Sequence, residues 1–319
     1  RRETVPKCST GPRPDPRPGY PAAMPFGLLA GLGAALAWGT MDVASALAGR
    51  RLGSLAVTAG GQLVSAIILF ALLFWSGEAL PADVRVVVIS AALGIVGAGA
   101  YLAYFTGLRV GPIAVVSGMV AAYGGLVVVL AVVVRSETLT ILQAVGAVIA
   151  TVGVIMTGVA FHEGWRNVRL AGPGVGFAIV ALVLFAIMTI GLAEAMETAG
   201  WLPVIALSRG VNAVLTGGLV ALALVSGHRL FRPVMTASLA PNRRAWLLIA
   251  LGGALDAVGL IALAIGLERA PTWLVGLASS FGPAVTILAA VAFLGERLRP
   301  VQWIGLAGIA AGLVAIALP

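Results

Sequence analysis

Charged side chains are scarce in this sequence. They make up 10% of the 319 residues, against about 25% in an ordinary globular domain. Apolar residues account for 60%, and a further 42 residues are glycine. A soluble chain of this length needs a polar coat around its core, and so few charges cannot supply one. The composition therefore excludes a soluble domain and indicates an integral membrane protein.

The side chains that build disulfides, metal sites and hydrolytic centres are also scarce. Cys8 is the only cysteine, which excludes a disulfide framework and a cysteine-based metal site. His162 and His228 lie in polar connections, and Lys7, the only lysine, precedes the first apolar run. No H-E-x-x-H motif occurs, so an enzyme embedded in the membrane is disfavoured. We expect no metal and no cofactor.

Basic residues outnumber acidic ones and give a net charge of +8, but they are scattered singly between apolar runs. Without a basic stripe interleaved with aromatic residues, this charge indicates no nucleic-acid partner. Part of the excess lies in residues 1–24, which are rich in Arg and Pro and show no apolar period. We expect this segment to be a disordered or non-native N-terminal tail.

Long apolar stretches follow the tail and alternate with short polar breaks. Each stretch is long enough to cross a hydrocarbon core of about 30 Å as a helix. We predict an all-α integral membrane fold with ten transmembrane helices, arranged as a first repeat over 25–160, a loop over 161–172 and a second repeat over 173–319. The ten predicted spans are 25–47, 54–76, 86–108, 112–134, 139–160, 173–195, 202–226, 245–267, 271–294 and 298–318.

An internal repeat relates the two halves. A shift of 159 residues aligns 91–153 with 250–312 without a gap, with 15 of 63 positions identical. The rare residues match too, as Pro112 does with Pro271 and Glu137 with Glu296. Because five spans per repeat reverse the orientation, the halves must be related by a pseudo-two-fold axis in the membrane plane. Secondary transporters are built on this inverted-repeat plan.

Much of the repeated pattern has a structural explanation. Thr140 and Gln143 have the spacing of a capping box at the start of span five. Small residues let helices approach closely, so we expect spans five and ten to pack rather than to bind substrate. These small residues are Gly146, Ala150 and Gly153 in span five, and Gly308 and Gly312 in span ten.

The doubled pattern G-L-x-x-x-P, a helix, then E-x-L-x-x-x-Q-x-x-G resembles the drug/metabolite transporter superfamily, in particular its EamA-like members with ten helices. Trp38-Gly39 is similar to the Trp-Gly of the family's first helix. The pattern stands at Gly107-Leu108, Pro112, Glu137, Leu139, Gln143 and Gly146, and again at Gly266-Leu267, Pro271, Glu296, Leu298, Gln302 and Gly305.

The resemblance covers residues 25–318 and implies a secondary-active exporter of small metabolites that works by alternating access. Amino acids, including aromatic ones, are the substrates that we expect first, with protons as a candidate coupling ion. The resemblance also implies a central cavity. Heavy use of Arg, Ala, Gly and Val is typical of bacterial proteins, so we expect the lipid bilayer of a bacterial inner membrane as surroundings. The oligomeric state stays open, and a monomer suffices for this plan. A multidrug or cation effluxer of the same fold is the alternative, and a passive pore is the alternative from another class.

Interruptions of spans four and nine are candidate hinges. Gly124 and Gly125 lie near the middle of span four, and Gly282 and Pro283 lie at almost the same depth in span nine. Interrupted helices at matching depths are where transporters form their substrate sites. A tolerated packing kink is the plainer explanation, because membrane helices accommodate proline and glycine.

Ionisable residues inside spans are costly, which makes three of them candidate site residues. Asp42 or Asp256 would face the ammonium of an amino acid, Arg209 would pair with its carboxylate, and Asn212 would add a contact one turn further on. Asp256 is also the first candidate for a carboxylate that carries protons. An ion pair between Arg209 and Asp256 and a hydrated Asp42 near the interface are the structural alternatives.

Aromatic residues could line the same cavity. Tyr101 and Tyr104 share a face of span three, and Trp38, Tyr123 and Ser280 are the further candidate contacts. Aromatic pairs at helical spacing are also common in ordinary packing.

The distribution of arginine gives an orientation. Connections after odd-numbered spans and their edges carry eleven arginines, whereas connections after even-numbered spans carry three. The positive-inside rule places the odd connections in the cytoplasm and both termini outside. The resemblance implies cytoplasmic termini instead, and we favour the charge count.

Overall fold

A computed structural model describes residues 20–111, 113–158, 173–226, 243–282, 284–285 and 300–317. Within these ranges every regular element is a helix. The first half contains α1 (Tyr20–Leu52), α2 (Ser54–Ser76), α3 (Val84–Val110), α4 (Ile113–Ala121), α5 (Tyr123–Arg135) and α6 (Ile141–Gly158). The second half contains α7 (Pro173–Ala199), α8 (Trp201–Val225), α9 (Arg243–Arg269), α10 (Thr272–Ser279) and α12 (Pro300–Ala317).

Seven of the described segments are long and apolar enough to cross a membrane, one of them running through α4 and α5. Shorter apolar helices lie within α6 and α12. The all-α membrane fold is therefore confirmed, and the helices correspond to the predicted spans, with span nine described as far as residue 285.

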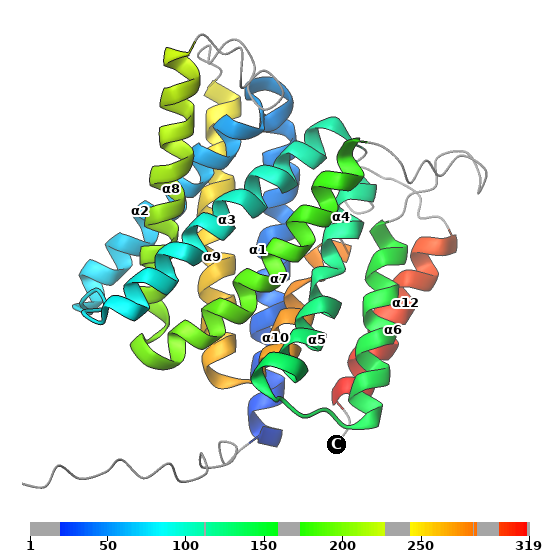
Figure 1. Ribbon diagram of the computed structural model, residues 1–319. Coiled ribbons are helices and arrows are strands. Elements are labelled where there is room, and N and C mark those ends of the chain that lie inside the picture. Colours follow the sequence, from blue (N-terminus) through cyan, green and yellow to red (C-terminus); the bar gives the residue numbers. More distant parts are fainter. Residues whose placement is uncertain are drawn as a thin grey trace, which may run out of the picture.

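Helix pairing follows the inverted repeat (Figure 1). The first helix of each half packs against the third helix of the other half, as α1 does on α9 and α7 on α3. The second helices, α2 and α8, pack against each other, and so do the fifth helices, α6 and α12. The bundle is thus woven from both halves rather than divided between them.

Repeated glycines make the same contact in each half. A Cβ at Gly94 on α3 would lie 2.5 Å from the carbonyl oxygen of Ser208 on α8. A Cβ at Gly253 on α9 would lie 2.5 Å from the carbonyl oxygen of Gly61 on α2. Since Gly94 and Gly253 are aligned by the 159-residue shift, the sequence repeat records equivalent helix crossings.

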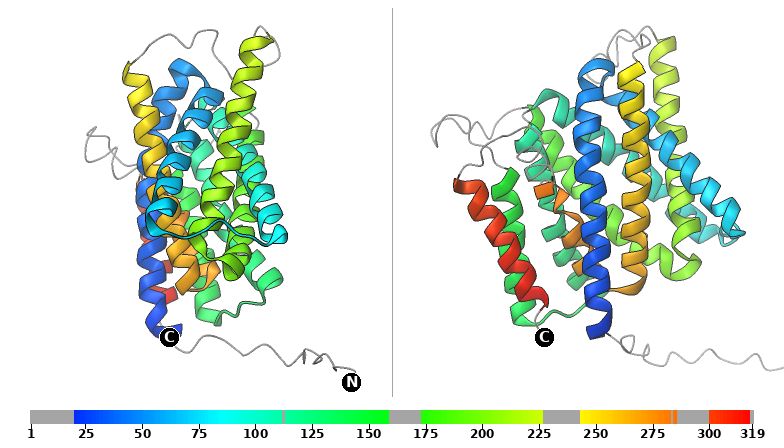
Figure 2. Two further views of the ribbon diagram at one scale, coloured as in Figure 1. Left: turned by 90° about the vertical axis from the view of Figure 1, so that its left-hand side faces the viewer. Right: turned by 180° about the vertical axis from the view of Figure 1, so that it is seen from behind.

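The helices α6 and α12 form a pair at one side of the bundle (Figures 1 and 2). A Cβ at Gly146 would lie 2.9 Å from the carbonyl oxygen of Gly312, so the two backbones touch, as the small-residue faces predict. The capping box is also present. The Thr140 amide donates to the Gln143 side chain at 3.0 Å, and the Gln143 amide donates to the Thr140 hydroxyl at 3.2 Å.

The bundle has two chemically different ends. The helix α1 begins and α12 ends at the same end, at the bottom of Figure 1. We call this end the acidic face, because six carboxylates gather there with three arginines: Glu78, Asp83, Glu137, Glu194, Glu197 and Glu268, with Arg85, Arg135 and Arg269. The opposite end is the arginine-rich face, with Arg50, Arg51, Arg109, Arg243 and Arg244 at helix ends.

Two boundaries differ from the predicted ones. The helix α1 begins at Tyr20, inside the segment expected to be a tail, and keeps Pro25 within its early turns. Span four is interrupted at Ala122, two residues before the expected position, and therefore forms the separate helices α4 and α5.

Candidate functional site

A cavity lies between the halves, at the level where span four and span nine are interrupted. It holds about 60 Å³ of free volume, which is room for a few water molecules. Helices α1, α3, α4, α5, α7 and α10 all contribute to its wall. The lining residues are Trp38, Met41, Asp42, Tyr101, Tyr104, Ser117, Val120, Ala121, Tyr123, Phe185, Met188, Thr189, Ser279, Ser280 and Gly282.

Asp42 is the only carboxylate among these lining residues. Its Oδ2 accepts a hydrogen bond of 2.6 Å from the Tyr104 hydroxyl, whereas its Oδ1 has no partner. The side chain is 5% exposed, so the hydrated position near the interface that the sequence left open does not describe it. A buried carboxylate oxygen without a partner is costly, and a cationic group in the cavity would satisfy it.

Phe185 on α7 stands at the centre of the aromatic wall. Its ring meets Tyr101 edge to face at a centroid distance of 5.1 Å, and it meets Tyr104 in the same way at 6.0 Å. Tyr123 packs against it at 6.1 Å. All four aromatic residues predicted for this wall line the cavity: Trp38, Tyr101, Tyr104 and Tyr123.

Arg209 and Asp256 form a buried ion pair beside this wall. Arg209 Nη2 lies 3.2 Å from Asp256 Oδ1, and the two side chains are 2% and 1% exposed. The Tyr101 hydroxyl donates to the same Oδ1 at 2.6 Å and accepts from Arg209 Nη2 at 2.9 Å. Arg209 Nη1 donates to Gln62 Oε1 at 2.8 Å. We call these four residues the Asp256 cluster.

The Asp256 cluster reaches the cavity only through Tyr101. Arg209, Asn212 and Asp256 are not among the residues that line the cavity, although all three were predicted as substrate contacts. Asn212 is fully buried, and both polar atoms of its side chain lack a partner. The geometry thus realises the alternative in which Arg209 and Asp256 pair with each other.

The two helix interruptions touch each other at the cavity. The Tyr123 hydroxyl, at the start of α5, shares a hydrogen bond of 2.7 Å with the Ser279 hydroxyl at the end of α10. A Cβ at Gly124 would overlap the hydroxyl of Ser280, so this glycine lets α5 and α10 cross closely. Gly125 faces Thr151 on α6 instead.

The remaining predicted hinge residues belong to span nine. Gly282 packs against Gly39 on α1, where a Cβ at Gly39 would lie 2.5 Å from its carbonyl oxygen. Pro283 lies outside the described residues.

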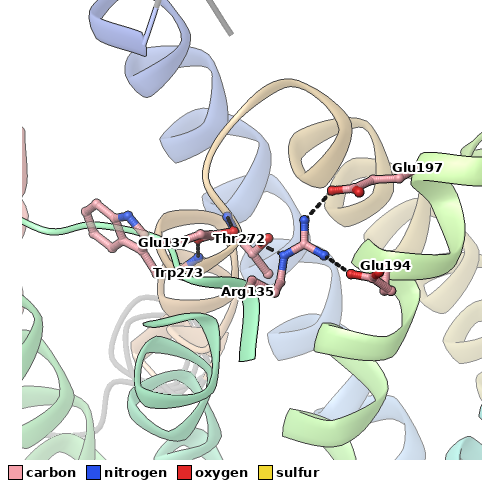
Figure 3. Close-up of polar contacts among 6 residues, drawn as sticks. All are labelled: Arg135, Glu137, Glu194, Glu197, Thr272 and Trp273. Atoms are coloured by element: carbon pink, nitrogen blue, oxygen red, sulfur yellow. Dashed lines mark hydrogen bonds and ion pairs between the residues drawn. The ribbon is translucent and has the colours of Figure 1, made fainter. Parts of the chain in front are cut away.

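A charged cluster lies at the acidic face, where α5, α7 and α10 meet (Figure 3). Arg135, at the end of α5, contacts Glu194 at 2.9 Å and Glu197 at 2.5 Å on α7, and Glu137 at 3.2 Å. Glu137 in turn accepts from the backbone amides at the start of α10, Thr272 at 3.2 Å and Trp273 at 3.1 Å. We call this arrangement the Arg135 cluster.

Apolar side chains fill the space between the cavity and the Arg135 cluster. They come from α5, α7 and α10, with α1 packed against them, and they include Val127, Ile190, Trp273, Leu274 and Leu277. Three helices that wall the cavity are therefore joined twice on this side, first by apolar packing and then by charge.

Several residues of these sites were not predicted. Gln62 is a lone amide in an apolar span, a signal that could have found it. Phe185 is one apolar residue within an apolar run and gives no such signal. The contacts of Arg135 with α7 join residues 59 and 62 positions apart, which no local pattern indicates. Groups of three or more potential metal ligands are absent from the part of the chain that the structure describes.

Comparison with known proteins identifies the family to which the sequence belongs. The sequence matches the description "EamA-like transporter family" twice, over residues 25–159 and 172–318. The chain belongs to the EamA-like transporter family. It is therefore a multi-pass membrane protein and a transporter of small molecules, and the family resemblance drawn from the motifs is confirmed.

A solved crystal structure has the same fold. It aligns with 91% of this chain and 95% of its own at a TM-score of 0.73, with 20% sequence identity. At that identity the likeness concerns the fold alone. Among curated proteins, none matches this EamA-like sequence.

Proposed function

We propose that the protein is a secondary-active transporter that exports small amine-bearing metabolites by alternating access, with amino acids, including aromatic ones, as its first substrate class. Asp42 carries this proposal, because it is the one carboxylate among the described residues of the cavity wall and one of its oxygens has no partner. We assign both termini to the outside and the arginine-rich face to the cytoplasm of a bacterial inner membrane.

Asp42 would hold the ammonium group of the substrate. Hydrogen bonds to charged groups contribute about 1.5–3 kcal/mol in proteins. Each 1.4 kcal/mol corresponds to a factor of about ten in affinity, so this contact alone supports a preference of about 10–100-fold for amines over neutral isosteres. Tyr104 keeps the carboxylate in place from the other oxygen.

The aromatic wall would hold the substrate side chain. Phe185, Tyr101 and Tyr104 already pack edge to face, and aromatic rings favour this arrangement, so an aromatic ring of the substrate could pack against them in the same way. The carboxylate of an amino acid would lie near the hydroxyls of Tyr123, Ser279 and Ser280. The amino end of α5 begins there, and the positive end of a broken helix is where transporters receive anionic groups.

Two equivalent packings of the inverted halves supply the alternating states. The Arg135 cluster and the apolar layer above it would keep the acidic face closed in this state. The repeat aligns Arg135 with Leu294, so the second half does not repeat the arginine of this closure at the matching position. Opening the acidic face must therefore separate Arg135 from the glutamates of α7.

Efflux of organic cations without a carboxylate is the second candidate function. The commitment of Arg209 to Asp256, Tyr101 and Gln62 favours it, because no described residue on the cavity wall is cationic. A substrate carboxylate is then tolerated rather than required.

Transport in proteoliposomes separates these functions. Three compounds share one ring and differ in charge: phenylalanine, phenethylamine without the carboxylate, and 3-phenylpropionate without the amine. We expect saturable exchange of phenylalanine, competition by phenethylamine and none by 3-phenylpropionate. Uptake of phenethylamine with no uptake of any amino acid would favour the cation effluxer. Linear uptake without saturation or exchange would indicate a pore and overturn both.

A further inference from the structure

A groove lies between α3 and α8 on the outside of the bundle, and α8 lies on the side away from α6 and α12 (Figures 1 and 2). It holds about 510 Å³ of free volume, within the range of about 300–1,000 Å³ for small-molecule pockets. Residues between Ile95 and Leu102 on α3 and between Val214 and Leu222 on α8 form its wall, and all of them are apolar or glycine. Ile95 is 57% exposed and Val214 is 75% exposed, so the groove opens to the surroundings of the protein. We call it the α3–α8 groove.

The groove forms because α3 and α8 touch at one level and then diverge. Gly94 meets the carbonyl oxygen of Ser208, where a Cβ would lie at 2.5 Å. At Gly218, ten residues further along α8, a Cβ would meet nothing within 4 Å. Ten residues correspond to about 15 Å of helix, and both helices run from the acidic face to the arginine-rich face. The space between them therefore opens toward the arginine-rich face.

The groove lies at the depth of the lipid chains of one leaflet. Its lining on α3 starts at Ile95, near the middle of that helix, and ends at Leu102, eight residues before Val110. Eight residues correspond to about 12 Å along a helix, and the hydrocarbon core of a bilayer is about 30 Å thick. Since α3 and α8 are both long and apolar enough to cross a membrane, the groove faces hydrocarbon in the half next to the arginine-rich face.

An arginine follows the groove on the same stripe of α3. Ile95, Leu102 and Arg109 are spaced by seven residues, which is nearly two helical turns, so their side chains point in nearly the same direction. Arg109 lies in the last turn of α3 and is half-buried. About 10 Å along the helix separates it from Leu102. The stripe thus changes from apolar to basic where a phospholipid changes from chain to phosphate.

Arg51 belongs to the same corner of the bundle. The Ser54 hydroxyl, at the start of α2, shares a hydrogen bond of 3.0 Å with the Thr106 hydroxyl on α3. Arg51 precedes Ser54 by three residues, and Arg109 follows Thr106 by three. In the described part of the chain, the carboxylates at helix ends lie at the opposite, acidic face. The charges of this corner therefore suit an anionic group.

We propose that the α3–α8 groove binds an anionic phospholipid, with one acyl chain in the groove and the phosphate against Arg109 and Arg51. Lipid chains are as apolar as the groove, so the apolar wall determines where the chain packs and adds little preference for one lipid over another. The preference comes from the arginines, because one basic residue at a membrane surface favours anionic lipid by about fivefold. The inference does not depend on which substrate the protein transports.

A second copy of the chain fits the groove less well. In a two-fold dimer the same surface of both copies meets, so two grooves would face each other and their volume would stay empty. An acyl chain is flexible and is already present at this depth. It would also contact α3 of the first half and α8 of the second half, and so stabilise the packing between the halves.

The test measures lipid binding to the purified protein by native mass spectrometry from a non-ionic detergent. The lipids are phosphatidylglycerol and phosphatidylcholine with the same oleoyl chains, and glycerol 3-phosphate supplies the phosphate without a chain. We expect one phosphatidylglycerol to bind at least about fivefold more tightly than phosphatidylcholine, and no binding of glycerol 3-phosphate. Phosphatidylglycerol should also raise the melting temperature of the protein more than phosphatidylcholine does.

Matched variants locate the lipid. G218L fills the groove from a glycine whose Cβ would meet open space. G217L adds the same side chain at the next residue, which is equally open but does not line the groove. The preference for phosphatidylglycerol should be lost in G218L and kept in G217L. R109Q should weaken its binding by about fivefold, whereas R85Q, at the other end of α3, should leave it unchanged.

The other outcomes each overturn the inference. Equal binding of the two phospholipids by the wild type, or equal binding of phosphatidylglycerol by G218L and G217L, would make the groove part of the general lipid-facing surface. A dimer that G218L alone dissociates would assign the groove to a second copy. Binding of glycerol 3-phosphate would indicate an anion site without a chain. If G218L does not fold, equal affinity of R109Q and R85Q would still contradict the proposal.

Discussion

Asp42 and Asp256 are both buried acids that accept a 2.6 Å hydrogen bond from a tyrosine of α3, yet only Asp42 lines the cavity and only Asp256 has a cationic partner. Asp256 has a cation of its own in Arg209, whereas no described cationic side chain pairs with Asp42. The fold itself neutralises Asp256, whereas Asp42 is left to be neutralised by a group in the cavity. The supply of a partner, rather than burial, therefore distinguishes a structural acid from one that receives a substrate.

The largest expected effect concerns stability on the Asp256 side. D256N or R209Q alone leaves one buried charge without its partner, which costs about 3–5 kcal/mol. The double variant should recover most of this loss, since hydrogen-bonding groups remain at both positions. Thermal unfolding of the purified variants in detergent measures the cycle. Equal stability of the two single variants and the wild type would contradict the ion pair.

The next effect concerns transport on the Asp42 side. D42N should lower the rate of phenylalanine uptake at low substrate concentration by about 10–100-fold, because the charge that holds the ammonium is lost. Its melting temperature should not fall, since no partner cation is left behind. E78Q, at an exposed position of the acidic face, is the matched control and should transport normally. A stable, fully active D42N protein would remove Asp42 from the site.

A third effect tests whether the crossing of α5 and α10 belongs to the same site. G124A places a methyl group against Ser280 and should impair transport together with stability, by about 1–3 kcal/mol for an overpacked contact. G217A on α8 meets nothing within 4 Å and is the control. Measuring uptake and melting temperature of both should show a loss in G124A only; equal behaviour would mean that the crossing is loose.

The smallest expected effect lies at the Arg135 cluster. Glu194 and Glu197 are 64% and 45% exposed, so solvent screens these pairs and each contributes at most about 1 kcal/mol. R135Q removes both pairs and should therefore shift the equilibrium between the closed and open acidic face by no more than about 30-fold. Labelling of a cysteine introduced by T189C, in a C8S background, reports this opening. An unchanged labelling rate would show that the apolar layer alone closes this face.

The sequence predicted the parts of this molecule that depend on composition, periodicity and the repeat. The helical spans, the capping box at Thr140 and Gln143, and the glycine contacts between α6 and α12 follow from local rules that hold in any context. Rarity alone singled out Asp42, Arg209 and Asp256 as costly residues in apolar spans.

The partners of these residues could not be read in the same way. Asp256 and Tyr101 are 155 residues apart, and only the woven packing of the halves brings them together. For Arg209 the sequence left two partners open, a substrate and Asp256. It could not choose between them, because the pairing depends on the rotation of α8 against α9, which sequence periodicity does not fix. The position of the helix interruption also depends on packing between distant segments. Gly124 is needed because it lets α5 approach α10 closely, and the helix is interrupted at Ala122 instead.

Binding of phenethylamine to purified protein tests the central claim most directly, because this amine needs only the open acid. Its affinity should fall at least about tenfold in D42N and stay within about threefold of the wild type in D256N/R209Q. Wild-type affinity in D42N, together with a loss in D256N/R209Q, would show that the substrate meets the Asp256 cluster and would contradict the account.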